Sequence, residues 1–376
     1  MIEAFGIPSS CSKGWNKSLA KKVMVAMSGG VDSSVAALLL QKQGYEVLGI
    51  TMQIWQDVGQ QTGACCSLEA VSDAQQVAWQ LGIPHYVLNF RDEFKTRVID
   101  YFCDEYLHGR TPNPCIICNR CLKFELLLSK AIAMEADFIA TGHYARIIKD
   151  EASGLYMLFN GLDSNKDQSY ALYTLTQYQL EHTLFPLGTY TKQEVRKFAD
   201  DAGLPVFNKA ESQDLCFVSA GRYGEFVDNY PGLETKTGLF RDTSGNVLGR
   251  HKGIHHYTIG QRKGLGLPLG YPAYVTGIDA DTDTVWVGTN QELFQSTLYA
   301  DNVHYISNTP LEQAMELTIK IRYSAAQVPA LVTPLENQRI KIDFRTPQRA
   351  ITPGQAAVLY DKDQVVGGGT ICFIGQ

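Results

Sequence analysis

The sequence predicts an α/β domain built on a parallel sheet, followed by two small β domains. From residue 23 to about residue 141, runs typical of strands alternate with runs typical of helices, a pattern that implies a parallel sheet with right-handed crossovers. The first apolar run ends in Ser-Gly-Gly at residues 28–30, directly before a helix-forming run. After about residue 217, Gly, Thr and Asp separate short β-prone runs, a spacing typical of small antiparallel barrels.

Each element follows from a local pattern. Strands are expected at 23–27, 47–52, 85–89 and 137–141, and helices at 32–43, 68–81, 94–107 and 118–135. Thr191 and Glu194 form a capping box that opens a further helix, which ends at Gly203 before Pro205. Later β-prone runs lie at 247–248, 274–276, 284–287, 317–323 and 339–344. We therefore divide the chain into an N-terminal tail (1–20), an α/β domain (21–216), a central β-rich domain (217–290) and a C-terminal β-barrel (291–376).

Composition narrows the class of protein. The chain has 376 residues, a formal net charge of −6 and nine cysteines. It holds no apolar run near the roughly 20 residues of a membrane span and no apolar signal-peptide core, so we expect a cytoplasmic protein without membrane attachment. Cysteines in such a protein argue for catalysis or metal binding over structural disulfides. The acidic balance does not exclude nucleic acid, because only the local face matters, and basic clusters lie at 250–256 and 261–263.

Residues 28–33, Ser-Gly-Gly-Val-Asp-Ser, indicate a phosphate-binding turn between a strand and a helix. Glycines let the backbone bend sharply and approach a ligand, and the first N–H groups of the helix point into the loop. Asp32 would repel phosphate unless Mg²⁺ bridges the two or the carboxylate aligns a nucleophile. A turn of this kind alone is more often a plain strand–helix connection, and neither a P-loop lysine nor a dinucleotide-binding glycine pattern is present.

The loop resembles the PP-loop of the ATP pyrophosphatases, whose domain is adenine nucleotide alpha hydrolase-like. In that family the loop holds the pyrophosphate of ATP while the α-phosphate is attacked and AMP is passed to a substrate oxygen. Met52 and Gly142, like the loop, lie at the carboxyl ends of predicted strands. Ligands of parallel sheets bind at the carboxyl ends of strands, so we expect the nucleotide among these residues.

Cys115, Cys118 and Cys121 form a Cys-x-x-Cys-x-x-Cys segment that follows a loop with two prolines. We expect Cys118 near the N-terminus of a helix, with Arg120 and Lys123 close by in sequence. Both features favour a thiolate and make Cys118 a candidate nucleophile. A zinc half-site is the alternative, but structural zinc takes four ligands and the sequence holds no second Cys-x-x-Cys. We therefore expect no metal at this segment.

Cys216 stands between Leu215 and Phe217 and has, taken alone, the setting of an inert core cysteine. Six motifs in order change this interpretation. They lie at 28–33, 110–124, 141–146, 166–170, 211–218 and 257–266. Through them the chain, from about residue 21 to its C-terminus, resembles the tRNA-specific 2-thiouridylases, the MnmA (TrmU) family. Any one motif alone is unspecific, whereas all six in order are highly specific.

The resemblance implies an ATP-dependent tRNA-uridine 2-sulfurtransferase. ATP with Mg²⁺ adenylates the C2 oxygen of the wobble uridine, pyrophosphate and AMP are released, and sulfur comes from a persulfide on Cys216. Cys118 is implied as the nucleophile, and a Cys118–Cys216 disulfide forms and must be reduced. The implied partners are tRNAs that read split codon boxes (Lys, Glu and Gln) and a sulfur-delivery protein such as a cysteine desulfurase or a relay protein. We expect the two thiols to approach when loop 205–216 closes over ATP and the flipped uridine.

The resemblance also implies contacts. Those to ATP are Ala26, Met27, Ser28, Gly29, Gly30, Val31, Asp32, Ser33, Met52 and Gly142. Those to the target base are Asn113, Pro114 and Cys115, and those to tRNA are Lys166, Asp167, Gln168, Arg322 and Tyr323. Some members carry Asp at the position of Cys115, so an iron–sulfur cluster on Cys115, Cys118 and Cys216 is an alternative. We favour the bare thiols, because they explain the reaction without iron.

Two other functions compete with this one. Another PP-loop adenylating synthetase, acting on a small molecule, would not need paired cysteines and two β domains after the catalytic domain. An RNA-binding module with a dead nucleotide site would not need Ser28, Asp32 and Ser33 intact.

Overall fold

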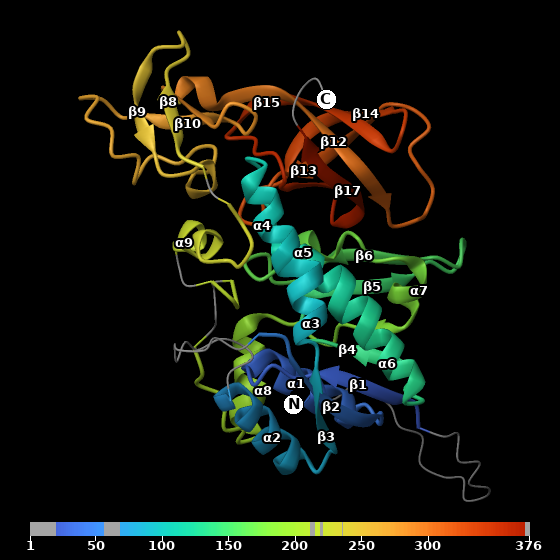
Figure 1. Ribbon diagram of the computed structural model, residues 1–376. Helices are drawn as coiled ribbons and strands as arrows, with labels where there is room; N and C mark the ends of the chain where they lie inside the picture. The colour runs from blue at the N-terminus through green and yellow to red at the C-terminus, as the bar shows by residue number, and fades with distance from the viewer. Residues whose placement is uncertain (1–19, 56–67, 211–214, 219–220, 235, 373–376) are drawn as a thin grey trace, which may run out of the picture.

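The computed structural model describes residues 20–55, 68–210, 215–218, 221–234 and 236–372. A five-stranded parallel sheet, a four-stranded sheet and a closed antiparallel barrel follow one another along the chain, which confirms the predicted fold class (Figure 1). The predicted N-terminal tail lies outside the described residues apart from Ala20. Among the described residues, no helix is both long and apolar enough to cross a membrane.

The parallel sheet has the order β3-β2-β1-β4-β7, and every neighbouring pair is parallel. Its strands are β1 Lys22–Ala26, β2 Glu46–Gln53, β3 His85–Asn89, β4 Phe138–Ala140 and β7 Thr183–Leu184. The chain adds β2 and β3 on one side of β1 and then returns to place β4 on the other side. The loops that leave β1 and β4 therefore diverge, and a crevice opens between them at the carboxyl edge of the sheet.

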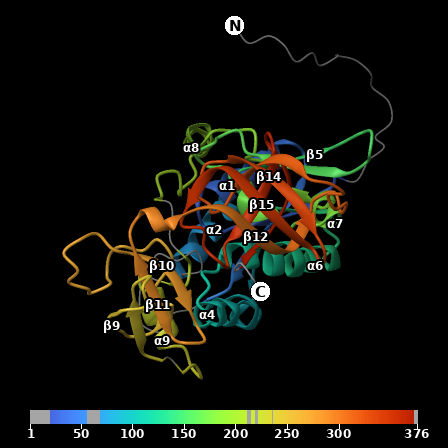
Figure 2. The ribbon, with the colours of Figure 1, turned by 90° about the horizontal axis from the view of Figure 1, so that it is seen from above.

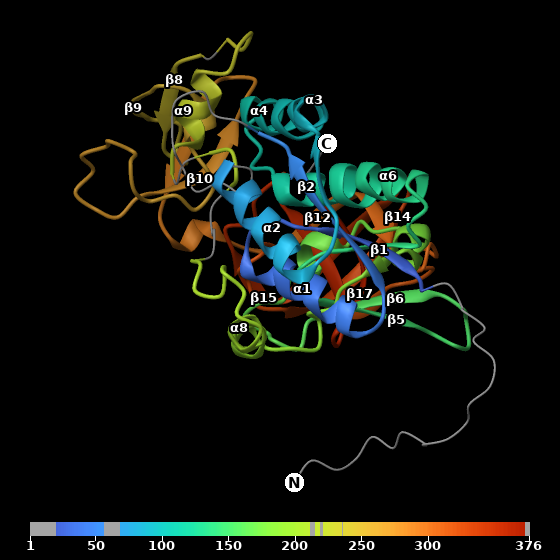
Figure 3. The ribbon, with the colours of Figure 1, turned by 90° about the horizontal axis from the view of Figure 1, so that it is seen from below.

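Helices cover both faces of this sheet. Val23 and Val25 pack with α1 Val31–Lys42, α2 Leu68–Leu81 and α8 Lys192–Asp201, which Figure 3 shows from below. Met24 points the opposite way and packs with the helices that follow β3. These are α3 Arg91–Phe94, η1 Lys95–Ile99 and α4 Asp100–Leu107, then α5 Pro114–Cys118, η2 Asn119–Leu126 and α6 Leu127–Ala133. The capping box at Thr191 is confirmed, because its hydroxyl accepts from the N–H of Glu194.

The expected start of the cysteine helix at Cys118 is wrong. The helix begins at Pro114, where the Asn113 side chain accepts a hydrogen bond from the N–H of Cys115 at 3.1 Å. Proline is preset for the first helical position and needs no N–H partner there, and Asn is a preferred N-cap residue. The helix continues without a break through η2, a π-helical stretch that the sequence analysis did not anticipate.

The central sheet contains β8 Gly238–Arg241, β9 Val247–His251, β10 Tyr274–Asp279 and β11 Thr284–Gly288, in the order β10-β11-β8-β9. Its outer pairs are antiparallel, but β8 and β11 are parallel. The expectation of purely antiparallel pairing is thus wrong for this pair. The connection between the two strands contains β9, η4 Ile254–His256 and β10, which is enough chain to return in the same direction.

The barrel closes through six antiparallel strands in the order β12-β15-β14-β13-β16-β17, with β17 paired back to β12. They are β12 Phe294–Tyr305, β13 Met315–Lys320, β14 Val328–Leu335, β15 Arg339–Arg349, β16 Ala356–Asp361 and β17 Gln364–Cys372. The hairpin of β5 Ala145–Lys149 and β6 Tyr156–Asn160 extends this sheet through the pair Leu158 and Val365. The barrel sheet therefore includes chain that precedes β7 of the parallel sheet (Figure 2).

The barrel also holds the loop that leads into the cysteine helix. The N–H of Thr111 donates to the carbonyl of Pro353 at 2.8 Å, and Gln355 Nε2 donates to the carbonyl of Thr111 at 2.8 Å. Gly354 has a φ of 88° and lies so close that a Cβ there would be 2.9 Å from the Thr111 nitrogen. The barrel therefore holds the loop that leads into α5, and through this loop it helps to set the position of α5.

Candidate active site

The turn after β1 is held open by glycine and serine. Gly29 has a φ of 69°, and a Cβ on it would overlap the carbonyl of Ala70 at the start of α2. Ser33 Oγ accepts from the N–H of Ser28 at 3.1 Å and donates to the carbonyl of Gly30 at 3.2 Å. Ser34 Oγ donates to the same carbonyl at 2.8 Å. These hydrogen bonds hold the turn in one conformation. Its backbone N–H groups lie at the N-terminus of α1.

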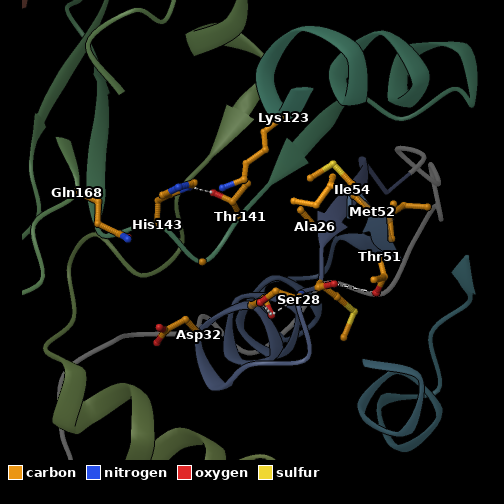
Figure 4. A pocket seen from close by; sticks show the side chains of 14 residues that line it. Ala26, Ser28, Asp32, Thr51, Met52, Ile54, Lys123, Thr141, His143 and Gln168 are labelled. Atoms are coloured by element: carbon orange, nitrogen blue, oxygen red, sulfur yellow. Dashed lines mark hydrogen bonds between the residues drawn. The ribbon is translucent and has the colours of Figure 1, made fainter. Parts of the chain in front are cut away.

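A pocket opens at the crevice between the ends of β1 and β4 (Figure 4). Its lining includes the predicted ATP residues Ala26, Met27, Ser28, Asp32, Ser33, Met52 and Gly142. Gly29, Gly30 and Val31 form the turn and the first helical position beside it. Gly142 is close to α1, since a Cβ on it would be 2.8 Å from the Ser33 nitrogen. The loops after β1 and β4 thus meet as the sequence predicted, although no local pattern joins them.

Asp32 has partners that the sequence analysis missed. Lys192 Nζ lies 2.8 Å from each carboxylate oxygen of Asp32, and the Tyr144 hydroxyl donates to Oδ1 at 2.8 Å. Lys192 is the first residue of α8, where the Thr191 cap fixes its backbone, and its side chain is buried. The pair keeps the carboxylate charge compensated beside the pocket. The capping box marked this helix start, but nothing in the spacing pointed to Asp32.

A lysine and a histidine line the opposite wall of the pocket (Figure 4). Thr141 Oγ1 and His143 Nδ1 form a hydrogen bond of 2.7 Å. Burial, and then the charge of Lys123, hold the pKa of His143 well below its usual value, so the ring is neutral near pH 7. Lys123 extends from η2 and supplies a cation to the pocket. From the sequence, Lys123 was expected only to lie near Cys118. Its position in the π-helical stretch η2 places it in the pocket lining instead.

Cys118 is the last residue of α5 and is 9% exposed. It therefore lies a full turn beyond the helix N-terminus. The helix dipole, which was expected to favour the thiolate of Cys118, acts mainly within the first turn, so its effect on this thiol is weaker than expected. The next residue, Asn119, donates from Nδ2 to the carbonyl of Ala171 at 3.0 Å, which fixes this part of the helix on η3 Ser169–Leu172. Cys115 sits in the first turn of α5 and is exposed.

Cys216 is half-buried and packs against the hydrophobic cluster that contains Cys118. The following residue, Phe217, holds it there through edge-on ring contacts with Phe94, Phe102 and Phe226 at centroid distances of 5.5, 5.2 and 5.4 Å. Both predicted cysteines thus contact one extended hydrophobic cluster, which runs from β1 to the barrel strands β16 and β17. Residues 211–214 of the same motif, and with them part of loop 205–216, lie outside the described residues.

The two predicted tRNA-contacting segments also meet. Tyr170 and Tyr323 have ring centroids 6.2 Å apart, and Lys320 lies over both rings. Arg322 and Tyr323 are exposed and Lys166 is half-buried. Gln168 lines the pocket, and its Oε1 accepts from the N–H of Tyr144 at 3.0 Å.

Asp167 differs from the other predicted tRNA contacts, because it is buried. Its Oδ1 accepts from the N–H groups of Gly161 and Ser169 at 3.0 and 3.1 Å, and its Oδ2 accepts from the Ser169 hydroxyl at 3.0 Å. Lys320 Nζ is 3.9 Å from the same carboxylate. These contacts give Asp167 the role of ordering the loop between Lys166 and η3.

The basic clusters of the central domain divide by burial. Arg250, Lys252, Arg262 and Lys263 are exposed. The histidines of the first cluster face inward, and burial lowers the pKa of His251 and His256. The positive charge of this surface therefore comes from arginine and lysine alone.

Three family models match the chain in order. The model described as "tRNA methyl transferase HUP domain" matches residues 21–220. The model described as "tRNA methyl transferase PRC-barrel domain" matches residues 224–289, and that described as "Aminomethyltransferase beta-barrel domain" matches residues 295–371.

Curated relatives match over nearly their whole length. The tRNA-specific 2-thiouridylase MnmA of Acetivibrio thermocellus is 55% identical over 355 residues, which are 93% of this chain and 99% of that protein. The protein of the same name from Clostridioides difficile is 53% identical over 353 residues, or 93% of this chain and 98% of its own. Among solved structures, an NMN synthetase from Francisella tularensis covers 52% of this chain and 68% of its own, with 17% identity and a TM-score of 0.34. A structural likeness of that size carries no argument about the site.

The buried His143 predicts a pH dependence of stability. Its pKa in the folded protein lies below the usual 6.5, so the unfolded chain binds a proton there that the folded protein excludes. The free energy of unfolding should therefore fall as pH drops below that value, by up to about 1.4 kcal/mol per pH unit for this group. Urea unfolding between about pH 7 and pH 5 should show a shallower pH slope for His143→Gln. His108→Gln, at an exposed side chain, is the control, and an unchanged slope in His143→Gln would contradict the assignment.

Proposed function

The chain belongs to the family of the tRNA-specific 2-thiouridylases, and we propose that it catalyses the ATP-dependent 2-thiolation of the wobble uridine of tRNA. The observation that carries this proposal is the pairing of a phosphate-binding turn with two cysteines of one hydrophobic cluster, Cys118 and Cys216. A small-molecule synthetase would have no use for the second feature. Two of the matching family models carry methyl transferase in their descriptions, so the assay below distinguishes sulfur from methyl transfer.

In the proposed first step, the C2 oxygen of the uridine attacks the α-phosphate of ATP and pyrophosphate leaves. Three features support this role for the pocket: the N–H groups at the start of α1, the ammonium of Lys123, and the Asp32–Lys192 pair. The N–H groups and Lys123 suit phosphate oxygens. Asp32 can lie beside the phosphates because Lys192 compensates its charge. Mg²⁺ brought by ATP would bind Asp32 beside its contacts to Lys192 and Tyr144, or in place of one of them.

In the proposed second step, the terminal sulfur of a Cys216 persulfide attacks C2, and AMP leaves with the oxygen. The product is a C2–S–S–Cys216 link. The Cys118 thiolate then attacks the Cys216 sulfur, which releases 2-thiouridine and leaves a Cys118–Cys216 disulfide. An external dithiol reduces that disulfide by two electrons. Reactive thiols of this kind need a reducing compartment, which supports a cytoplasmic location as part of the proposal.

The proposed tRNA surface runs from the pocket to the barrel. Gln168 at the pocket and the exposed Arg322 and Tyr323 are linked through Tyr170. We include Lys166, Asn113, Pro114 and Cys115 in it and assign Asp167 an indirect role. The tRNAs are those of split codon boxes, and a cysteine desulfurase or relay protein charges Cys216 with sulfur.

Replacing either reactive cysteine should abolish the reaction. We expect no 2-thiouridine with Cys118→Ser or Cys216→Ser after incubation with tRNA, ATP and a persulfide donor, and unchanged product with Cys121→Ser, a half-buried thiol on the same helical run. Mass spectrometry of the tRNA nucleosides measures the product and separates added sulfur from an added methyl group. A Cys216→Ser enzyme that thiolates fully would overturn the persulfide assignment.

Iron analysis of active protein tests the alternative of an iron–sulfur cluster on Cys115, Cys118 and Cys216. Full activity without iron supports the bare thiols.

Removing the carboxylate of Asp32 should stop the first step selectively. Lys192 then loses its contacts to Asp32 and its charge disturbs the phosphate site, so tRNA-dependent AMP formation from ATP by Asp32→Ala should fall about 100-fold or more. Binding of tRNA, measured by filter retention, should change little. Asp92→Ala, an exposed acid at the start of α3, is the control. Normal AMP formation by Asp32→Ala would remove the turn from the reaction.

The affinity for tRNA should weaken as salt rises. Each lysine or arginine that neutralises a phosphate releases counterions, so the slope of log affinity against log salt should shrink by about one for Lys166→Ala or Arg322→Ala. Lys130→Ala, an exposed change on α6, should leave the slope unchanged. Slopes equal to that of the unmodified protein in both test variants would exclude these contacts to phosphate.

A further inference from the structure

Three side chains of metal-binding type meet where α9 Tyr223–Asp228 packs against η4 Ile254–His256, away from the pocket described above. His255 Nε2 lies 2.8 Å from Asp228 Oδ1, and His256 Nε2 lies 2.9 Å from Asp228 Oδ2. The imidazoles are 1% and 7% exposed, whereas the Asp228 carboxylate is 34% exposed. All three ligand atoms lie within 4.8 Å of one another.

The backbone around the two imidazoles is shaped to fit them. A Cβ on Gly224 would overlap the His256 ring, and a Cβ on Gly253 would overlap the His255 ring. The two rings lie side by side with centroids 4.3 Å apart. The Tyr223 hydroxyl donates to the carbonyl of His256 at 3.1 Å. The two imidazole rings thus fit closely against α9 and the two glycines. Both Nε2 atoms point toward the Asp228 carboxylate.

Hydrogen bonding alone does not satisfy this arrangement. His256 Nε2 is fully buried and makes no hydrogen bond of acceptable geometry, although a carboxylate oxygen is 2.9 Å away. A cation bound by both Nε2 and the carboxylate oxygen would give this buried nitrogen a partner.

We propose that Asp228, His255 and His256 form a binding site for a divalent transition-metal ion, with zinc as the ion that the ligand set suits best. Two imidazoles and one carboxylate form a common zinc ligand set. Zinc–nitrogen and zinc–oxygen bonds near 2.1 Å place ligand atoms of a tetrahedral ion roughly 3.4 Å apart, so the His–Asp contacts of 2.8 and 2.9 Å need to open by about half an ångström. Gly224, Glu225 and His256 border a surface cavity, which leaves the fourth position to water.

The site would add a second link between two parts of the chain that the hydrogen bond from Tyr223 to the carbonyl of His256 already joins. Asp228 ends α9, whose Phe226 ring contacts Phe217 next to Cys216. The histidines belong to η4, farther along the same central domain. A bound ion therefore ties α9, and with it the segment after Cys216, to η4. This inference does not depend on the proposed function, because its ligands lie outside the pocket and the cysteine cluster.

Zinc binding to the full-length protein tests the site. Equilibrium dialysis against Zn²⁺ should give one equivalent more for the unmodified protein than for Asp228→Asn or His256→Gln, with affinity at this site reduced about 100-fold or more. Zinc held by the Cys115–Cys121 segment must be separated from it, so Cys118→Ser should keep the extra equivalent. His108→Gln removes a comparable but exposed histidine, which lies 3.4 Å from Asp104, and should also keep it.

A second measurement guards against misfolded variants. Co²⁺ added to the unmodified protein after alkylation of its thiols should give d–d bands without a sulfur charge-transfer band, and added Zn²⁺ should displace it. Zn²⁺ should also raise the melting temperature of the unmodified protein and not that of folded Asp228→Asn. Equal zinc content in the unmodified protein and Asp228→Asn, or no Co²⁺ bands after alkylation, would leave the cluster as a hydrogen-bonded His–Asp group and overturn the proposal.

Discussion

The site depends on one constraint, the reversal of strand order between β1 and β4. The connection that leaves β1 and the connection that leaves β4 run to opposite sides of the sheet. The space between the carboxyl ends of the two strands therefore stays open to a ligand. Gly142 lets the second loop approach α1 to within contact of Ser33, and Gly29 lets α2 approach the first loop. The pocket is therefore a consequence of topology, and the glycines set how narrow it is.

The β domains do more than extend the chain. The barrel fixes Thr111 through its 352–355 loop, and Thr111 leads directly to the cap and first turn of the Cys118 helix. On the other side, an aromatic cluster with members from α3, α4 and α9 holds Phe217 and so places Cys216. Neither cysteine owes its position to the parallel sheet alone. A protein with the α/β domain only would keep the phosphate-binding turn, and it would lose the barrel contacts to Thr111 and the Phe226 contact to Phe217.

Charge is organised locally, against an acidic total. Asp32 and Asp167 are each matched with a lysine from a distant element, Lys192 and Lys320, so the acids closest to the pocket are compensated. Buried histidines add no charge near neutral pH, because desolvation lowers the pKa of His143, His251 and His256. The positive charge that a polyanion would contact therefore comes from the exposed arginines and lysines. This is why a net charge of −6 is compatible with a nucleic-acid substrate.

The sequence by itself determined the elements whose signals are local. Alternating apolar runs placed the parallel strands, the capping box placed α8, and the Ser-Gly-Gly turn with Met52 and Gly142 identified the pocket. Local signals could not determine long-range pairing: the β5–β6 hairpin joined to the barrel, the parallel β8–β11 pair, Lys192 on Asp32, or Asp228 beside histidines 27 and more positions away. The helix start expected at Cys118 was wrong although a local signal was present, because Asn113 caps the helix and Pro114 occupies its first position. Periodicity and caps act over a few residues, whereas these contacts depend on which surfaces the packed sheets and helices bring together.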